Sequence, residues 1–208
     1  MFALVNAPAV AEASATDRQL PIYCVQRDQK MLAISFDAAW GNEDTQQLID
    51  ILGKYNVKAT FFVVGDWVDK YPESVKALHD AGHEVMNHSN SHAHMSQLSS
   101  EAIVADVEAC NDKIEAVTGV RPTLIRPPYG EYDNNVITSI RSIGMEPIQW
   151  DVDSLDWKDL PAGEITERVV SRVQPGSIVL FHNAALHTPE ALPAILETLL
   201  QEGYTFVP

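Results

Sequence analysis

Residues 31–41 read M-L-A-I-S-F-D-A-A-W-G. The first six form a short apolar run of strand length, and Asp37 stands where that strand should end. Six more runs of strand length follow, and segments with the apolar spacing of helices separate them. This regular alternation predicts parallel strands joined by right-handed crossovers. The sequence therefore predicts an α/β fold, in which seven strand and helix units fit a barrel better than an open sheet.

The expected elements cover most of the chain. The expected strands span residues 31–36, 57–64, 83–87, 122–125, 146–150, 177–181 and 204–207. The expected helices span residues 45–55, 72–81, 99–117, 134–143, 165–173 and 189–201. Glycine follows several of these helical segments, where a left-handed cap is easiest for it.

The composition is that of one globular domain. The chain has 208 residues, of which 46% are hydrophobic and 21% charged, and no linker or low-complexity tract divides it. We expect one domain over residues 21–208, preceded by an arm at 1–20. The alanine-rich start of the arm has the character of a trimmed export segment, which would place the protein outside the cell or in its envelope. Its apolar stretch is too short and broken to cross a membrane.

The net charge disfavours several kinds of partner, and the cysteine content argues against a disulfide framework. The chain carries 14 basic and 29 acidic residues, a net charge of -15, and Lys and Arg do not cluster. Nucleic acids and anionic membranes are therefore unfavourable partners. Cys24 and Cys110 are too few for a disulfide framework, so we expect buried free thiols and leave a single bridge open. We expect a monomer.

Polar residues gather behind the C-terminal ends of the expected strands. They are Asp37, His88, His92, Arg126, Asp153, Asp156 and His182. In barrels and open parallel sheets, this rim is where ligands bind and chemistry takes place. We therefore expect these scattered residues to form one site.

The histidines of this set have two interpretations each. His88 and His92 lie four residues apart, so they can reach one metal ion on a helical turn or can be solvated loop residues. His182 closes an apolar run and can be a core histidine or a general acid.

The arginine and the carboxylates are similarly ambiguous. R-P-P-Y-G at 126–130 is a rigid turn that can present the Tyr129 amide to an oxyanion, or a plain surface turn. The carboxylates of D-V-D-S-L-D-W at 151–157 can serve a site or cap a helix.

Taken in order, these motifs resemble those of the polysaccharide deacetylase family, the NodB-homology domain of carbohydrate esterases. The matching stretches are H-S-x-x-H at 88–92, R-P-P-Y at 126–129, D-x-x-D-W at 153–157 and the apolar run closing on a histidine at 180–182. Several motifs in a fixed order are far more specific than one. The resemblance implies a single-domain distorted barrel of seven or eight β/α units. It also implies a metal-dependent hydrolase that removes N-acetyl groups from amino sugars.

The resemblance also implies a catalytic role for five residues. Asp37 would be the general base, held in place by Arg126. His182 would be the general acid, oriented by Asp156. The backbone amide of Tyr129 would stabilise the oxyanion.

Substrate and metal contacts follow from the same resemblance. Trp157 and Leu180 would line the acetyl pocket. The placement of the aromatic residues, rather than the resemblance, indicates that Trp40 stacks on sugars. His88 and His92 would hold a divalent metal, with zinc expected first and cobalt, nickel or manganese as alternatives.

One position departs from the family pattern. Family members usually carry T-F-D-D-G where this chain has S-F-D-A-A, so Ala38 replaces the aspartate that joins the two histidines on the metal. Metal affinity should therefore fall. Water, Asp37 itself, or another group such as Asn87, His94 or Asp44 could fill the gap.

The function inferred is deacetylation of cell-wall polysaccharide, with peptidoglycan N-acetylglucosamine as the first substrate and chitooligosaccharide as the second. The alternative is a metal-poor, catalytically weak relative that binds envelope glycan. Retention of Asp37 and His182 favours the enzyme, because a decayed enzyme commonly loses its base and acid. Hydrolysis of a non-sugar amide is a more distant alternative.

Overall fold

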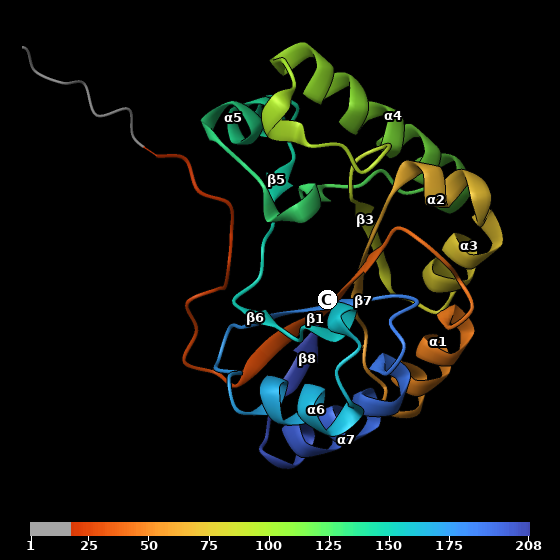
Figure 1. Ribbon diagram of the computed structural model, residues 1–208, viewed down its shortest axis with the longest axis vertical. Helices are drawn as coiled ribbons and strands as arrows, with labels where there is room; N and C mark the ends of the chain where they lie inside the picture. The colour runs from red at the N-terminus through yellow and green to blue at the C-terminus, as the bar shows by residue number, and fades with distance from the viewer. Residues whose placement is uncertain (1–17) are drawn as a thin grey trace, which may run out of the picture.

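The central sheet is parallel and curls into an incomplete barrel (Figure 1). The computed structural model describes residues 18–208, so most of the expected arm, 1–17, lies outside the described residues. The strands are β1 Met31–Ala38, β2 Thr60–Val63, β3 Glu84–Asn87, β4 Leu124–Ile125, β5 Glu146–Pro147, β6 Val152–Asp153, β7 Ile178–His182 and β8 Thr205–Val207. Their order in the sheet is β5-β4-β3-β2-β1-β7-β6, and β8 also pairs with β1. The expected α/β fold with parallel strands is confirmed.

The helices form an arc around the outer face of this sheet (Figure 1). They are α1 Thr45–Lys54, α2 Gly65–Lys70, α3 Pro72–Asp80, α4 Ser100–Thr118, α5 Asn134–Ser142, α6 Ala162–Val170 and α7 Thr188–Gln201. Three short 3-10 turns, η1 Met95–Gln97, η2 Pro128–Gly130 and η3 Asp156–Lys158, lie in the connections. Within residues 18–208, no helix has the length and apolar character needed to cross a membrane.

Alternation along β1 decides which side chains reach the site. Phe36 points to the helices, where its ring stacks on Phe61 and Phe181 at centroid distances of 4.8 and 5.5 Å. Because successive strand residues face opposite sides, Asp37 points into the barrel. Ala38 is fully buried in the apolar cluster that contains Phe36, between sheet and helices.

A segment near the start of the described chain bridges β5 and the residues just before β7. We call residues 19–25 the seam segment. The Ile22 amide donates to the Pro147 carbonyl (3.0 Å), and the Ile22 carbonyl accepts from Gln149 (2.7 Å). Further along, the Val25 amide donates to the Gly176 carbonyl (2.9 Å). In Figure 1 this segment runs down the side that carries no helix.

The seam segment corrects two sequence expectations. Residues 19 and 20, assigned to the arm, are tied to α5: the Gln19 amide donates to Asn134 and Arg141 donates to the Leu20 carbonyl. Both cysteines are free, as expected, but Cys24 on the seam segment is exposed and only Cys110 is buried.

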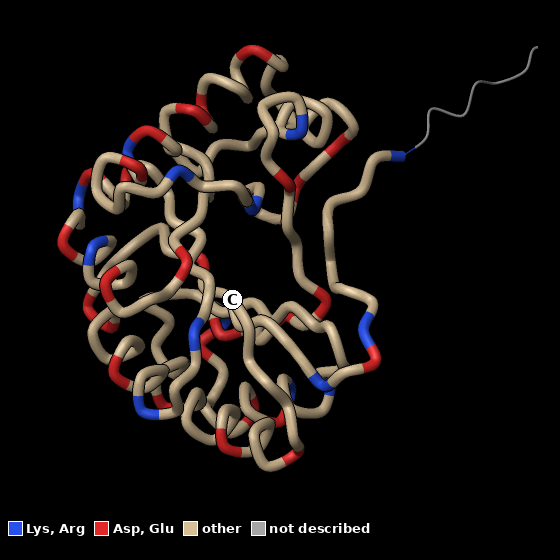
Figure 2. The backbone as a smooth tube through the Cα atoms, turned by 180° about the vertical axis from the view of Figure 1, so that it is seen from behind, with Lys and Arg blue, Asp and Glu red and all other residues tan. Residues whose placement is uncertain are grey.

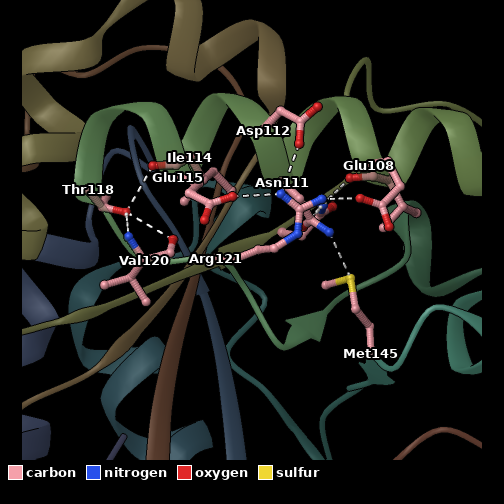
Figure 3. Close-up of polar contacts among 11 residues, drawn as sticks. Glu108, Asn111, Asp112, Ile114, Glu115, Thr118, Val120, Arg121 and Met145 are labelled. Atoms are coloured by element: carbon pink, nitrogen blue, oxygen red, sulfur yellow. Dashed lines mark hydrogen bonds and ion pairs between the residues drawn. The ribbon is translucent and has the colours of Figure 1, made fainter.

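Helix α4 anchors the start of residues 88–94, which we call the histidine loop, through Asn87. Figure 3 shows Asn111 of this helix and Arg121, which follows it. Asn111 on its inner face accepts from Asn87 at 2.8 Å and donates to the Met145 sulfur at 3.1 Å. On the outer face Arg121 forms ion pairs with Glu108, Asp112 and Glu115. These outer pairs are partly exposed and contribute little stability, whereas the buried Asn87 directly precedes His88.

Acidic residues are scattered along the helices and loops of the backbone drawn in Figure 2. In the same view, Lys and Arg form no continuous group among residues 18–208. This distribution agrees with the expectation that a polyanion is an unfavourable partner.

Candidate active site

The expected site residues meet at one cavity of about 400 Å³ at the C-terminal ends of the strands. Its lining includes nine of them: Asp37, Trp40, His88, His92, Tyr129, Asp153, Trp157, Leu180 and His182. The other two, Arg126 and Asp156, are fully buried. A second cavity of about 220 Å³ in the barrel is lined chiefly by apolar side chains and lacks such a constellation.

Asp37 is held as a carboxylate by a buried arginine. Arg126 donates to Asp37 Oδ1 at 2.7 Å, to Ser35 Oγ at 2.8 Å and to the Gln149 carbonyl at 3.1 Å, and its guanidinium lies 4.2 Å from the Phe62 ring centroid. Burial is the largest single influence and opposes ionisation of Asp37, but the charge and hydrogen bond of Arg126, together with His88 and His182, outweigh it and hold the pKa of Asp37 below its usual range. Asp37 is therefore anionic and fixed in direction at neutral pH.

The two histidines beside Asp37 are neutral. His88 Nδ1 lies 2.6 Å from the Arg126 carbonyl, which can only accept, so His88 Nε2 carries the lone pair. His92 lies close by, with a centroid distance of 5.0 Å to the His88 ring. Burial lowers the pKa of both histidines, to about 4 for His92. Neutral imidazoles are the form that binds metal ions.

The geometry around His88 fits a cation. His88 Nε2 lies 3.5 Å from Asp37 Oδ2, so a lone pair and a carboxylate oxygen face each other. Two ligands of a tetrahedral zinc stand about 3.4 Å apart, given zinc–ligand bonds of about 2.0–2.1 Å. A hydrogen bond to the second imidazole nitrogen is also the usual support of a metal-binding histidine.

The donor set is nevertheless incomplete. Among the described residues, no group of three His, Cys, Asp or Glu side chains is arranged to hold a metal ion. Ala38 packs in the core and supplies no ligand. His88 and His92 therefore fit a divalent ion as a neutral pair, which should bind it more weakly than a site with a further carboxylate.

The substitute ligands considered from sequence are engaged elsewhere. Asn87 donates to α4, and its oxygen accepts from the Ser89 amide. His94 hydrogen-bonds to Glu131 at 3.0 Å, and Asp44 accepts from the Ala184 amide at 2.8 Å. None of the three substitutes lines the cavity.

A second charged pair stands across the cavity. His182 Nδ1 lies 2.8 Å from Asp156 Oδ1, while Asp156 Oδ2 accepts from the His182 amide (2.8 Å) and the Thr188 hydroxyl (2.7 Å). Burial opposes protonation of His182, but the hydrogen bond and charge of Asp156 outweigh it, so the pKa of His182 is raised. The ring nitrogen not bound to Asp156 remains for the cavity.

Exposed aromatic rings surround the mouth. Trp40, Tyr129 and Trp157 are 64%, 56% and 55% exposed, which is unusual for rings of this size. Tyr129 has a left-handed backbone, with φ 61°, and its ring lies between His92 and His94 at centroid distances of 4.5 and 4.2 Å. Strained backbone of this kind is common at functional sites.

Sequence reasoning missed two cavity residues and gave a third no role. Trp150 and Gly130 line the cavity, and a Cβ on Gly130 would come within 3.0 Å of the Trp150 ring. The glycine after P-P-Y was the available signal for this close approach. Asp153, expected at the rim, also lines the cavity.

Comparison with known proteins identifies similar sequences. The sequence model described as polysaccharide deacetylase matches residues 25–148. Peptidoglycan-N-acetylmuramic acid deacetylase PdaC of Bacillus subtilis is 36% identical over 183 residues, 88% of this chain and 38% of that protein. Peptidoglycan-N-acetylglucosamine deacetylase PgdA of Listeria monocytogenes is 35% identical over 181 residues, 87% and 38% of the two chains. The chain thus spans well under half the length of these two relatives.

Solved structures show the same fold. The crystal structure of BA3943 from Bacillus anthracis, described as a CE4 family pseudoenzyme, superposes with a TM-score of 0.87 at 36% identity, covering 90% of this chain and 66% of that one. A mutant of that protein, with 37% identity and the same TM-score, is described as having restored enzymatic activity; 90% of this chain and 68% of that one are covered.

Proposed function

The chain belongs to the polysaccharide deacetylase family, as its motifs predicted, and we propose that it removes N-acetyl groups from amino sugars of cell-wall polysaccharide. Peptidoglycan N-acetylglucosamine is the proposed first substrate and chitooligosaccharide the second. One observation carries the proposal: an anionic Asp37 and a protonatable His182 line one cavity, each held by its own buried partner. We further propose that residues 21–208, together with residues 19 and 20 that are tied to α5, form one domain and that it acts at the cell envelope.

Asp37 and His182 carry opposite charges, and each serves one of the two proton transfers. Asp37 accepts a proton from the attacking water, whose oxygen forms a bond to the acetyl carbon. His182 donates a proton to the amide nitrogen as the carbon–nitrogen bond breaks. The products are acetate and a free amine.

Binding groups complete the proposed site. When bound at His88 and His92, a divalent ion, zinc in this proposal, supplies Lewis acidity and lowers the pKa of water. The backbone amide of Tyr129 stabilises the oxyanion, Trp157 and Leu180 hold the acetyl group, and Trp40 stacks on the sugar ring.

A second candidate is a glycan-binding protein of low activity. Ala38 lies in the core, and the described residues offer no three-ligand metal group. One structural relative is described as a pseudoenzyme. In this alternative, the exposed aromatic rings at the entrance of the cavity bind sugars. The two charged pairs then catalyse deacetylation slowly or not at all.

Zinc calorimetry and acetate release separate the two. Zinc binding to chelator-treated protein should require His88, and acetate release from chitotetraose at saturating zinc should be lost in Asp37→Asn. If the wild type binds chitotetraose but releases no acetate at saturating zinc, the glycan-binding candidate stands instead.

Ala38→Asp tests the missing ligand directly. The new carboxylate should lower stability without metal, because it is buried without a partner, and zinc should restore stability and bind more tightly than to the wild type. Ala38→Asn adds similar bulk without charge and is the control. Equal zinc affinity in Ala38→Asp and Ala38→Asn would show that this position cannot reach the metal.

A further inference from the structure

Asp153 lines the cavity without a cationic partner. No ion pair between its carboxylate and a Lys, Arg or His exists among residues 18–208. The mechanism above does not use this carboxylate, so its role is open.

Three contacts fix Asp153 in place. Oδ1 accepts from the Leu155 amide at 2.8 Å, a turn that leaves Oδ2 available. Its backbone carbonyl accepts from Arg168 at 2.6 Å, and Asp153 lies opposite Leu180 in the pairing of β6 with β7. A carboxylate supported in this way is a preorganised feature of the cavity wall.

Without a bound metal ion, no cationic side chain of the cavity lining offsets the carboxylate of Asp153, and Arg168 contacts only its backbone carbonyl. Asp37 is paired with Arg126, and His182 with Asp156. The cavity lining includes no lysine or arginine. Lys158 lies nearby, but its Nζ is over the Trp157 ring, 4.9 Å from the centroid, and it does not line the cavity.

This arrangement discriminates among amino sugars by charge. N-acetylglucosamine is neutral, its deacetylated form carries an ammonium, and N-acetylmuramic acid carries a carboxylate on its lactyl ether. A like charge in a partly dehydrated cavity is unfavourable, and an opposite charge is favourable.

We propose that Asp153 is a specificity-determining residue, which disfavours carboxylate-bearing muramic sugars and favours neutral or ammonium-bearing glucosamine units. The inference rests on the proposed function, since it assumes that amino sugars bind in this cavity. It further implies that strands already partly deacetylated remain good ligands.

Binding of three tetrasaccharides to chelator-treated, metal-free protein tests the proposal, because a bound dication would offset the charge of Asp153. The probes are chitotetraose, the glucosamine tetramer and a peptide-free tetramer of alternating N-acetylglucosamine and N-acetylmuramic acid. Affinities are read by thermophoresis at low salt, and acetate release is assayed in parallel samples at saturating zinc. Binding is the readout because Asp153 also adds to the field around His182 and could alter turnover.

Asp153→Asn keeps the acceptor for the Leu155 amide and removes only the charge. The matched control is Asp159→Asn, an exposed position with φ 55° where asparagine is well tolerated. The wild type should prefer chitotetraose to the muramic tetramer by about fivefold or more, and Asp153→Asn should remove most of that preference and weaken the glucosamine tetramer by about fivefold. Chitotetraose affinity should change less than about twofold, because it carries no charge.

Each outcome decides the inference. Equal wild-type affinities for the neutral and anionic tetramers, or equal effects of Asp153→Asn and Asp159→Asn, would overturn it, as would failure of all three probes to bind. If the charge ranking holds and depends on Asp153 but no acetate appears, deacetylation fails while the specificity inference stands.

Discussion

Arg126 is fully buried and donates to Asp37 over 2.7 Å, so each charge depends on the other. Arg126→Met leaves a buried carboxylate without a partner, and we expect the free energy of unfolding at pH 7 to fall by about 3–5 kcal/mol. In the wild type the depressed pKa of Asp37 adds stability above the unfolded value of 3.8, and this is lost as pH falls through the folded pKa. In the variant, burial is no longer opposed by Arg126, so we expect the pKa of Asp37 to rise and the deficit to shrink between pH 7 and pH 5.

Urea denaturation at the two pH values measures this deficit. The double variant Arg126→Met/Asp37→Asn is the control, because it removes both charges together. It should lose less stability than the sum of the two single variants. Additive losses would mean that the two side chains are not coupled.

The second residue-scale prediction concerns His182. Asp156→Asn removes the charge that favours the imidazolium, so the pKa of His182 should fall. In the wild type, the raised pKa of His182 stabilises the folded state. This contribution is complete below the unfolded value of 6.5 and is lost as the pH rises through the folded pKa. We expect Asp156→Asn to lose this contribution. The alkaline limb of acetate release should also move to lower pH.

Proton NMR titration of the His182 ring measures the shift without requiring activity. His83, whose pKa of about 4 is set first by burial, lies at the start of β3 and should titrate unchanged. An unchanged His182 titration in Asp156→Asn would remove the argument for a protonated acid.

At the element scale, the histidine loop meets the η2 turn through Tyr129. The rings of Tyr129 and His94 stack at 8°, and Glu131 accepts from both His94 Nδ1 and the Ser96 hydroxyl. We expect His94→Ala to free Tyr129 and to lower kcat about tenfold, with KM changed much less, if the Tyr129 amide acts only in the transition state.

The control for this contact is His94→Phe, which retains a flat ring. It should restore most of kcat although it cannot bond to Glu131. If His94→Phe is as impaired as His94→Ala, the hydrogen bond to Glu131 matters rather than the stacking. If neither variant changes kcat, Tyr129 needs no such support.

Most elements could be predicted because their signals are local. The apolar run of β1 and the periodic helix α4 end within two residues of their expected bounds. By contrast, α2 has six residues and β6 two, which is too short for periodicity to show. The rim residues were predictable from strand ends, and the pairing of Arg126 with Asp37 was expected from the family resemblance. The lack of an ion-pair partner for Asp153 depends on tertiary packing, which the sequence does not reveal.

At the scale of the whole molecule, the barrel is closed by a segment that sequence patterns assigned partly to a loose arm. The seam segment also connects to the site: the Ile22 carbonyl accepts from the Gln149 amide, and the Gln149 carbonyl accepts from Arg126. Closure of the barrel therefore supports the arginine that holds Asp37.

Gly176 is the position where this closure can be broken by one methyl group. It has φ +87°, and a Cβ there would lie 1.7 Å from the Val25 carbonyl oxygen. Gly176→Ala should therefore displace the seam segment and lower the free energy of unfolding by about 2 kcal/mol or more. Gly203→Ala is the matched control, since Gly203 has φ +86° but nothing within 4 Å of its added Cβ. Hydrogen exchange should rise at residues 19–25 and at Gln149 in Gly176→Ala alone; equal exchange in both variants would show that backbone strain, not loss of closure, accounts for the destabilisation.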